Sequence, residues 1–598
     1  MQYSIAFISL ALLAQDVVKM KILLIYPYFI EERIQVEDIT VPPIGIYYVG
    51  AVLKENKYEV EILNWHAIHK TPEKIEEVLT DRNPDVIGFS ILHANRWGGI
   101  DIAQMAKKLN PEVKIVFGGI GASLLWEHLL RHFPEIDFVV IGEGEDTFLD
   151  LIKWMGEGDE RLLQNIKGIA FRENGRVVKT EKADLQPDLD KLPIPANYFA
   201  YQHLSSTRGC AWNCAFCGSP EFWGHKIRFR STHNFLEELE LLYKKGITFF
   251  YISDDTFTMN KERVIEICKK IIEKNLKINW FAISRVDHVD GEILYWMRKA
   301  GCIQISYGVE SGSEKIRTVL NKKIGTDQIK KAFSLTVQYG MLSRAYFIYG
   351  SPGETWDTIQ ETLDLIHEIK PLSMIAYILD LFPGTQLYAD LQKRSRVTDD
   401  VWLNRIEGIM YFETDPDLSD ELILAFGEKL RTDFYKNIKN FVKSIDLIDE
   451  EDLYELHADF CSRLAMTFSH GDYSKIDLIR DKEEMAEKLY RKSLGYYPNH
   501  RAYLGLAIVK QKAEAYKESI EVLSEGIEYF PDSQDLNMCL GLSYMNLRDY
   551  DKALEYFLRY PDSKEALYQA AACYRELGDS KKESAYRQKC QNLERGLT

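Results

Sequence analysis

The chain of 598 residues is too long for one hydrophobic core, and its length predicts about four domains. A hydrophobic content of 46% and a charged content of 28% are typical of folded soluble proteins, which excludes extensive disorder. The formal net charge of −17 argues against general nucleic-acid binding, because such binding releases counterions through a basic surface.

The first feature along the chain is a short apolar run at residues 5–14. It follows no basic segment and is too short to span a bilayer, so we expect neither a secretory signal nor a membrane span. Met20 opens a second apolar run that is typical of a first β-strand. Residues 1–19 would then be an upstream extension.

Short β-rich runs alternate with amphipathic segments in the next part of the chain. We expect strands at residues 22–26, 59–63, 86–90, 114–117 and 138–141, and helices at residues 47–54, 72–79, 100–109 and 123–132. This alternation predicts a parallel, doubly wound α/β sheet. In such a sheet the ligand site lies beyond the carboxyl ends of the strands.

The expected carboxyl ends carry three unusual segments: Ser90-Ile-Leu92, Gly118-Gly119 and Gly142-Glu143-Gly-Glu145. Glycines there let a flat, bulky ligand approach the backbone, although a glycine pair alone also fits a simple turn. The order and spacing of the segments resemble the B12-binding domain attached to many radical S-adenosylmethionine (SAM) proteins. The resemblance places this domain at residues 20–155 and implies cobalamin binding by Ser90, Leu92, Gly118, Gly119, Gly142 and Glu143.

The chain departs from many B12-binding domains after the first strand. Where those domains have D-x-H-x-x-G, whose histidine ligates cobalt, residues 26–33 read Tyr-Pro-Tyr-Phe-Ile-Glu-Glu-Arg. Either cobalamin binds without a histidine ligand, as in radical SAM relatives, or the domain has kept its fold and lost the cofactor. We expect cobalamin to be retained.

A linker at residues 156–200 separates this domain from the next. It contains an expected hairpin at residues 168–178 and ends in Leu192-Pro-Ile-Pro195, whose prolines interrupt regular structure. From residue 201 to 430 the strand–helix alternation resumes. Six strands are expected, near Ser205 and at residues 249–253, 280–282, 304–308, 345–349 and 375–381.

Three cysteines follow the first of these strands with the spacing C-x3-C-x2-C: Cys210, Cys214 and Cys217. Three thiolates can hold three irons of a [4Fe–4S] cluster and leave the fourth iron open to a substrate, since full ligation takes four cysteines. A structural zinc site is the alternative, with a fourth ligand such as His203 or His225, but the chain has no second C-x2-C knuckle. Six scattered cysteines are expected to be small buried apolar residues: Cys268, Cys302, Cys461, Cys539, Cys573 and Cys590.

The cysteine spacing resembles the radical SAM superfamily, and the six strands match its open partial barrel. In that family the amino and carboxylate groups of SAM chelate the open iron. The resemblance implies SAM binding by residues of the cysteine loop and of the strand ends, where βα barrels have their active sites: Phe216, Asp254, Asp255, Glu310, Ser311 and Gly350. Asp254 could instead cap a helix, and the glycine turn after Gly350 could be only a turn.

Two further segments near the cysteines have expected roles. Trp212 and Phe216 would shield the cluster from water. Arg228 and Arg230 would either meet an anionic group of a cofactor or substrate, or form solvated salt bridges.

The rest of the chain is expected to be all helical, with a helical linker at residues 431–480 and repeats at residues 481–598. Pro498, Pro531 and Pro561 end successive units that are 33 and 30 residues apart. This pattern resembles tetratricopeptide repeats, whose helix pairs have a period near 34 and usually present a protein- or peptide-binding face. The repeats could instead cap the barrel or form a dimer.

Together the resemblances imply an α/β enzyme with a [4Fe–4S] cluster, SAM and cobalamin, which methylates an unactivated carbon of an unknown substrate. The alternatives are a radical SAM enzyme that cyclises, oxidises or rearranges without methylation, and an adaptor with a vestigial barrel. A flavodoxin- or ferredoxin-like electron donor is the expected partner. An exposed iron–sulfur site and free thiols favour the reducing cytoplasm.

Overall fold

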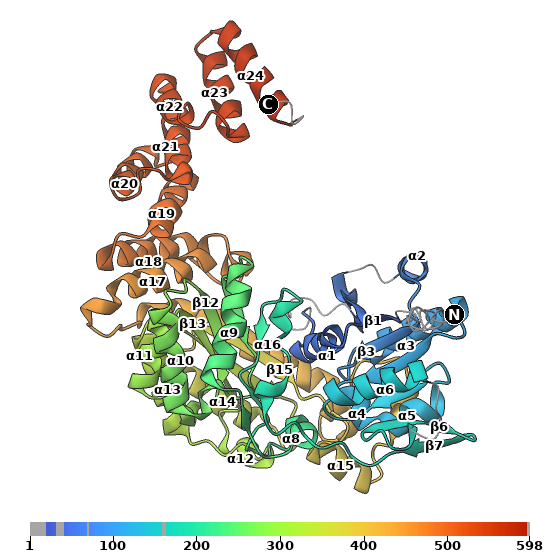
Figure 1. Ribbon diagram of the computed structural model, residues 1–598. Coiled ribbons are helices and arrows are strands. Elements are labelled where there is room, and N and C mark those ends of the chain that lie inside the picture. Colours follow the sequence, from blue (N-terminus) through green and yellow to red (C-terminus); the bar gives the residue numbers. More distant parts are fainter. Residues whose placement is uncertain (1–19, 32–40, 68–70, 158–162, 595–598) are drawn as a thin grey trace, which may run out of the picture.

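The computed structural model describes residues 20–31, 41–67, 71–157 and 163–594. Two α/β units lie side by side, and a helical region follows them (Figure 1). The apolar run at residues 5–14 lies outside the described residues. Within these residues, no helix is both long and apolar enough to cross a membrane.

The first unit contains a seven-stranded sheet in the order β2-β1-β3-β4-β5-β6-β7. Its strands are β1 (Lys21–Tyr26), β2 (Glu59–Asn64), β3 (Val86–Ser90), β4 (Lys114–Gly118), β5 (Phe138–Val140), β6 (Ile169–Glu173) and β7 (Arg176–Lys179). The first five run parallel, as the alternation predicted, because helices return the chain across the sheet faces. The hairpin β6–β7 extends the sheet antiparallel, and its turn uses positive φ at Asn174 and Gly175.

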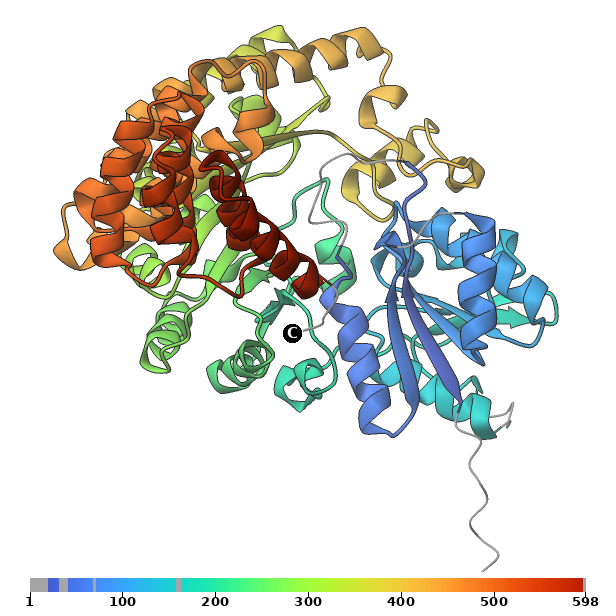
Figure 2. The same cartoon turned by 90° about the horizontal axis from the view of Figure 1, so that it is seen from above.

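Helices cover both faces of this sheet (Figures 1 and 2). They are α1 (Ile44–Glu55), α2 (Pro72–Arg82), α3 (Arg96–Leu109), α4 (Ile120–Leu124), α5 (Trp126–His132) and α6 (Glu145–Glu157). The helix expected at residues 123–132 is in fact two helices. They meet at Leu125, whose side chain is buried and whose φ of −114° is outside the helical range.

The second unit contains a six-stranded, all-parallel sheet in the order β15-β14-β13-β12-β11-β8. Its strands are β8 (His203–Leu204), β11 (Phe249–Ile252), β12 (Asn279–Ser284), β13 (Cys302–Glu310), β14 (Leu342–Tyr349) and β15 (Ser373–Ile378). The intervening helices are α8 (Ser219–Trp223), α9 (Thr232–Lys244), α10 (Lys261–Glu273), α11 (Gly291–Lys299), α12 (Glu314–Val319), α13 (Thr326–Gln338), α14 (Trp356–Ile369) and α15 (Gln386–Lys393). This is the expected open partial barrel.

The C-terminal region is all helical, as predicted. It comprises α16 (Asp420–Lys443), α17 (Tyr454–Ser469), α18 (Lys482–Tyr496), α19 (His500–Lys512), α20 (Tyr516–Tyr529), α21 (Gln534–Asn546), α22 (Tyr550–Phe557), α23 (Lys564–Glu576) and α24 (Ser580–Glu594). α16 runs through residue 430, where we expected a domain boundary, because Phe426 and Phe434 continue one buried face. Helices α19 to α24 extend away from both sheets (Figure 1).

The periodic prolines separate helical hairpins in this region. Pro498, Pro531 and Pro561 precede α19, α21 and α23 respectively. Small residues let the helices approach closely: a Cβ on Gly526 would lie 2.9 Å from the Tyr503 ring. The hairpin periodicity therefore has a packing basis.

Candidate cofactor site between the two sheets

The cysteine loop is framed by a two-stranded ladder, β9 (Thr207–Arg208) and β10 (Arg228–Phe229). It begins at Gly209, where φ is +99° and a Cβ would lie 2.8 Å from the Lys226 carbonyl oxygen. Its middle is held from two distant segments, since Ala215 N–H donates to the Leu320 carbonyl (2.9 Å) and Leu387 N–H donates to the Ala215 carbonyl (3.0 Å). The backbone between Cys214 and Cys217 is thus fixed from both sides.

The three thiols are partly exposed, and their sulfur atoms do not all lie within 4.8 Å of one another. Among the residues that the structure describes, only one group brings three metal-ligating atoms within 4.8 Å of one another, and it contains no cysteine. A zinc ion with bonds of about 2.3 Å to sulfur needs closer thiolates than that. His203 is engaged elsewhere, because its Nδ1 lies 2.9 Å from Ser253 Oγ and its ring stacks on Tyr251. The arrangement favours a cluster over zinc.

The two acidic residues after β11, Asp254 and Asp255, lie in different environments. Asp254 is 1% exposed and accepts hydrogen bonds from Ser206 N–H (2.6 Å) and Thr207 N–H (3.1 Å), so it fixes the backbone that enters the cysteine loop. Asp255 accepts a hydrogen bond from the Ser219 hydroxyl. Burial raises the pKa of Asp255 above its usual value. Of the two carboxylates, that of Asp255 belongs to a residue lining the cavity described below, whereas Asp254 does not line it.

Glu310 ends β13 with φ of +67°, which is strained for a residue with a side chain. Its buried carboxylate pairs with Lys322 at 2.8 Å. A Cβ on Gly308 would lie 2.7 Å from Lys322 Nζ, so glycine makes room for this pair. The neighbouring Ser311 is fully buried and bonds to Thr362 at 3.2 Å.

The turn after β14 is organised by a buried carboxyl group that we had not predicted. Gly350, with φ of +78°, and Ser351 donate their N–H groups to Glu354. Burial raises the pKa of Glu354 to about 7.

Phe216, in the cysteine loop, is a partly buried side chain that packs against the main hydrophobic core.

A cavity that opens to solvent lies where the carboxyl ends of the two sheets meet. All six residues that we expected to bind cobalamin line it: Ser90, Leu92, Gly118, Gly119, Gly142 and Glu143. The barrel contributes Ser205, Thr207, Arg208, Gly209, Ser253 and Asp255. Residues of the B12-binding domain and residues of the barrel, which belong to separate sequence motifs, therefore line the same cavity.

The lining suits a flat macrocycle. A Cβ on Gly142 would meet no atom within 4 Å, so this backbone faces open space, and one on Gly118 would make only ordinary contacts at 3.8 Å. Val116, Val140 and Phe148 supply apolar walls. Cobalamin, with its large corrin ring, fits these properties.

A buried ion-pair network closes one end of the cavity, and sequence reasoning missed it. Glu143 accepts hydrogen bonds from Arg208 (2.8 Å), Arg228 (2.9 Å) and the Gln186 N–H (2.7 Å), while Arg208 also pairs with Glu145. Burial would raise the pKa of Glu143, but the two arginines hold it below its usual value. The network joins the Gly-Glu-Gly-Glu loop to the β9–β10 ladder.

The structure also corrects an expectation about Arg228, in β10, and Arg230, which follows this strand. Arg228 pairs with Glu143, and Arg230 pairs with Glu238. Both guanidinium groups are buried, so their salt bridges are not solvated ones. The sequence carried no local signal for the Glu143 pairs, because Glu143 is 65 and 85 residues from its two partners.

Comparisons with known proteins agree with this geometry. Residues 38–152 match the B12 binding domain, and residues 204–366 match the radical SAM superfamily. An uncharacterized methyltransferase of Pyrococcus horikoshii is 31% identical over 381 residues, which cover 62% of this chain and 82% of the relative. The chain belongs to the radical SAM superfamily. Cobalamin, a [4Fe–4S] cluster and SAM are therefore its cofactors.

Other relatives of this radical SAM protein differ in the reaction that their names describe. The anaerobic magnesium-protoporphyrin IX monomethyl ester cyclase of Rubrivivax gelatinosus is 27% identical and covers 65% of this chain and 73% of the relative. The solved structure of the methyltransferase TsrM from Kitasatospora setae, with cobalamin and [4Fe–4S] cluster bound, matches with a TM-score of 0.58 at 16% identity, over 79% of this chain and 100% of that one. The cobalamin-dependent SAM radical enzyme OxsB matches at 0.55 and 16% identity, over 94% and 84%. These two structures share the fold.

Proposed function

We propose that this protein is a cobalamin-dependent radical SAM methyltransferase that methylates an unactivated carbon. The observation that carries the proposal is the single cavity lined by the cobalamin loops and by the strand ends next to the cysteine loop. When bound, the cluster with SAM would supply radical chemistry and cobalamin would supply the methyl group. A shared cavity brings the two sources of reactivity to one substrate carbon.

The chain's own residues hold this arrangement. Cys210, Cys214 and Cys217 would ligate three irons, and the backbone bonds of Ala215 keep their loop in place. Asp254 would act as a positioning residue, since its carboxylate is saturated by the backbone before the loop. Asp255, which lines the cavity, would face the SAM ammonium group.

Four further residues complete the proposed SAM site. The Glu310–Lys322 pair would present a carboxylate toward the ribose or methionine part of SAM, and its strained backbone indicates a functional constraint. Ser311 would support that turn through Thr362. The Gly350 turn would flank the adenosine, while Phe216 would shield the cluster side.

A second candidate function is radical oxidation or cyclisation without methyl transfer. The cyclase relative from Rubrivivax gelatinosus favours it, because its similarity extends over 65% of this chain. Both reactions would use the same cluster and cavity. The presence of methyl groups in the product separates them.

The helical tail would serve a partner rather than the chemistry. Its proline-separated hairpins support tetratricopeptide-like repeats that bind a protein or peptide, and they extend away from the cofactor cavity (Figure 1). We also propose cytoplasmic localisation and a flavodoxin- or ferredoxin-like electron donor.

The decisive experiment is anaerobic reconstitution with iron, sulfide and hydroxocobalamin, followed by iron and corrin analysis and incubation with isotopically labelled methyl-SAM and candidate substrates. Methyltransferase activity predicts bound corrin, deoxyadenosine formation and label in the product. Deoxyadenosine with an unlabelled, oxidised product would instead support the cyclase-like reaction. Iron without corrin would contradict the cobalamin assignment.

A further inference from the structure

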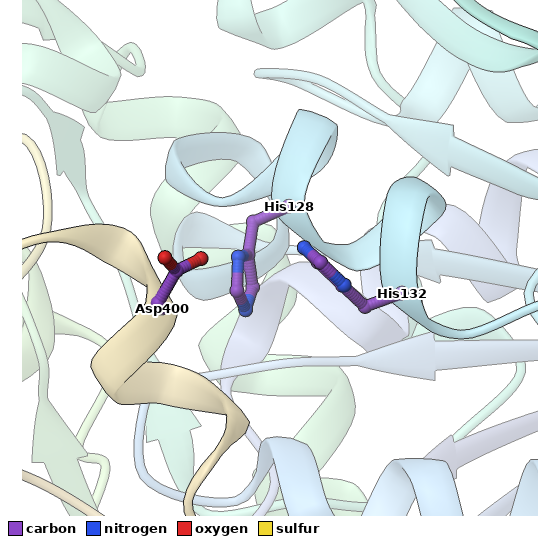
Figure 3. A group of neighbouring side chains, drawn as sticks. All are labelled: His128, His132 and Asp400. Atoms are coloured by element: carbon purple, nitrogen blue, oxygen red, sulfur yellow. The ribbon is translucent and has the colours of Figure 1, made fainter.

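A group of metal-ligating side chains lies outside the cofactor cavity. His128 and His132 are one helical turn apart on α5, and Asp400 belongs to the short helix η7 (Asp399–Leu403), which follows the barrel. One ligand atom of each residue lies within 4.8 Å of the others. Figure 3 shows the His128 ring between the side chains of His132 and Asp400.

The burial of His128 leaves one of its imidazole nitrogens without a protein partner. The residue is 7% exposed, and its Nε2 is enclosed without a hydrogen-bond partner among the described residues. Leaving such a group unpartnered costs about 1–3 kcal/mol, and native proteins contain few examples without an explanation such as a bound ion. His132 and Asp400 are exposed, so an ion can reach the site from solvent.

The donor set selects the class of ion. Two imidazole nitrogens and one carboxylate oxygen suit Zn²⁺, and histidines at positions i and i+4 of a helix point to one face, as in helical zinc sites. Zinc bonds of about 2.0–2.2 Å to nitrogen and oxygen require ligand atoms closer than 4.8 Å. Rotation of the two exposed side chains can close that gap, and water can fill the fourth position.

The location of the group gives the ion a structural role. The segment at residues 400–407 already docks on the first domain: Arg96 donates to the carbonyls of Ile406 (2.6 Å) and Glu407 (2.9 Å), and Arg405 pairs with Asp101. His128, His132 and Asp400 do not line the cofactor cavity. We propose that these three residues bind a zinc ion that ties the B12-binding domain to the segment after the barrel.

The first test measures zinc in the full-length protein with its cluster reconstituted, after incubation with zinc chloride and gel filtration. The wild type should retain about one zinc ion per chain. His132→Ala and Asp400→Ala, which alter one exposed ligand from each domain, should lose it. His233→Ala, an exposed histidine on α9, is the matched control and should keep it.

Zinc K-edge absorption distinguishes this site from the cysteine loop. The site predicts nitrogen and oxygen scatterers and no sulfur, whereas zinc at the cysteines would show sulfur at about 2.3 Å. Equal zinc retention in wild type and both ligand variants, no retention in the wild type, or sulfur ligation would each overturn the proposal.

Hydrogen exchange tests the proposed tie between the domains. Zinc should slow exchange of residues 399–407 about tenfold in the wild type and leave it unchanged in His132→Ala, because only a bound ion stabilises the docked segment. Zinc binding with the same exchange in the presence and absence of zinc would reject the structural role. This readout is independent of SAM cleavage and of the proposed methyl transfer.

Discussion

The two sheets contribute different kinds of surface to the cavity between them. The B12-binding side is mostly glycine backbone and apolar side chains, with Ser90, Glu143 and Glu145 as polar groups, whereas the barrel side carries hydroxyls, an arginine and a carboxylate beside two aromatic rings. The first surface suits a broad apolar ring, and the second suits polar groups that need directed hydrogen bonds. The comparison indicates that one side fixes a cofactor by shape and the other by chemistry, so substitutions on the two sides should have separable effects.

The largest expected effect is on the barrel side. Replacing a cluster ligand, Cys214→Ala, should abolish SAM cleavage, because two remaining thiolates cannot hold the cluster with one iron open. Iron content and deoxyadenosine formation measure the loss. Cys590→Ala, a buried cysteine in the tail, is the control and should retain both. Normal cleavage by Cys214→Ala would refute the cluster assignment.

The second largest effect is expected for the ion-pair network of Glu143, which joins the two domains. Glu143→Gln leaves Arg228 and Arg208 buried with less compensation and should lower the free energy of unfolding by roughly 3 kcal/mol. Thermal unfolding of the corrin-loaded protein measures it, with the exposed Glu112→Gln as control. A variant as stable as the wild type would show that the network does not hold the domains together.

A pH effect should follow from the turn after β14. The folded-state pKa of Glu354 is raised to about 7, so its stabilising contribution is present at acidic pH and is lost as pH rises through about 7. Stability should therefore fall by at most roughly 3 kcal/mol between pH 4.5 and 7.5. Glu354→Gln should flatten the profile of unfolding midpoint against pH, and exposed Glu361→Gln should keep it. Superimposable profiles of Glu354→Gln and wild type would count against a raised pKa.

The smallest expected effect isolates shape on the B12 side. Gly142→Leu should weaken cobalamin binding about tenfold or more, equal to about 1.4 kcal/mol, because the new side chain would enter open space in the cavity. Gly175→Leu is the matched control. The φ angle is +75° at Gly175 and +85° at Gly142, and a Cβ on either glycine would meet no atom within 4 Å, but Gly175 lies in the β6–β7 turn and does not line the cavity. Both share the strain of a left-handed residue. Equal corrin loss in the two variants would attribute the effect to strain alone.

The sequence predicted the architecture because local patterns determine it. Both parallel sheets, the hairpin and the helical tail follow from apolar periodicity, turn residues and proline spacing. The family and cofactors followed from the cysteine triplet and the glycine segments, which the comparisons confirmed. Individual site roles remain predictions.

Long-range contacts account for what the sequence could not predict. Nothing local to Glu143 indicates its arginines, and nothing near Asp254 shows that backbone N–H groups before the cysteine loop saturate its carboxylate. The break between α4 and α5 at Leu125 depends on tertiary packing of an otherwise helical segment. The group of His128, His132 and Asp400 could not be predicted either, because it forms only where η7 packs near α5, more than two hundred residues away in the sequence.

The shared cavity also sets an order for assembly during synthesis. The glycine loops emerge from the ribosome first, but a nascent chain that ends before Arg208 has only one wall and lacks the partners of Glu143. The complete lining exists only after the chain has grown past Asp255. Tight capture of a corrin should therefore wait until the barrel has started to fold against the first domain, although the helical tail need not yet have been made.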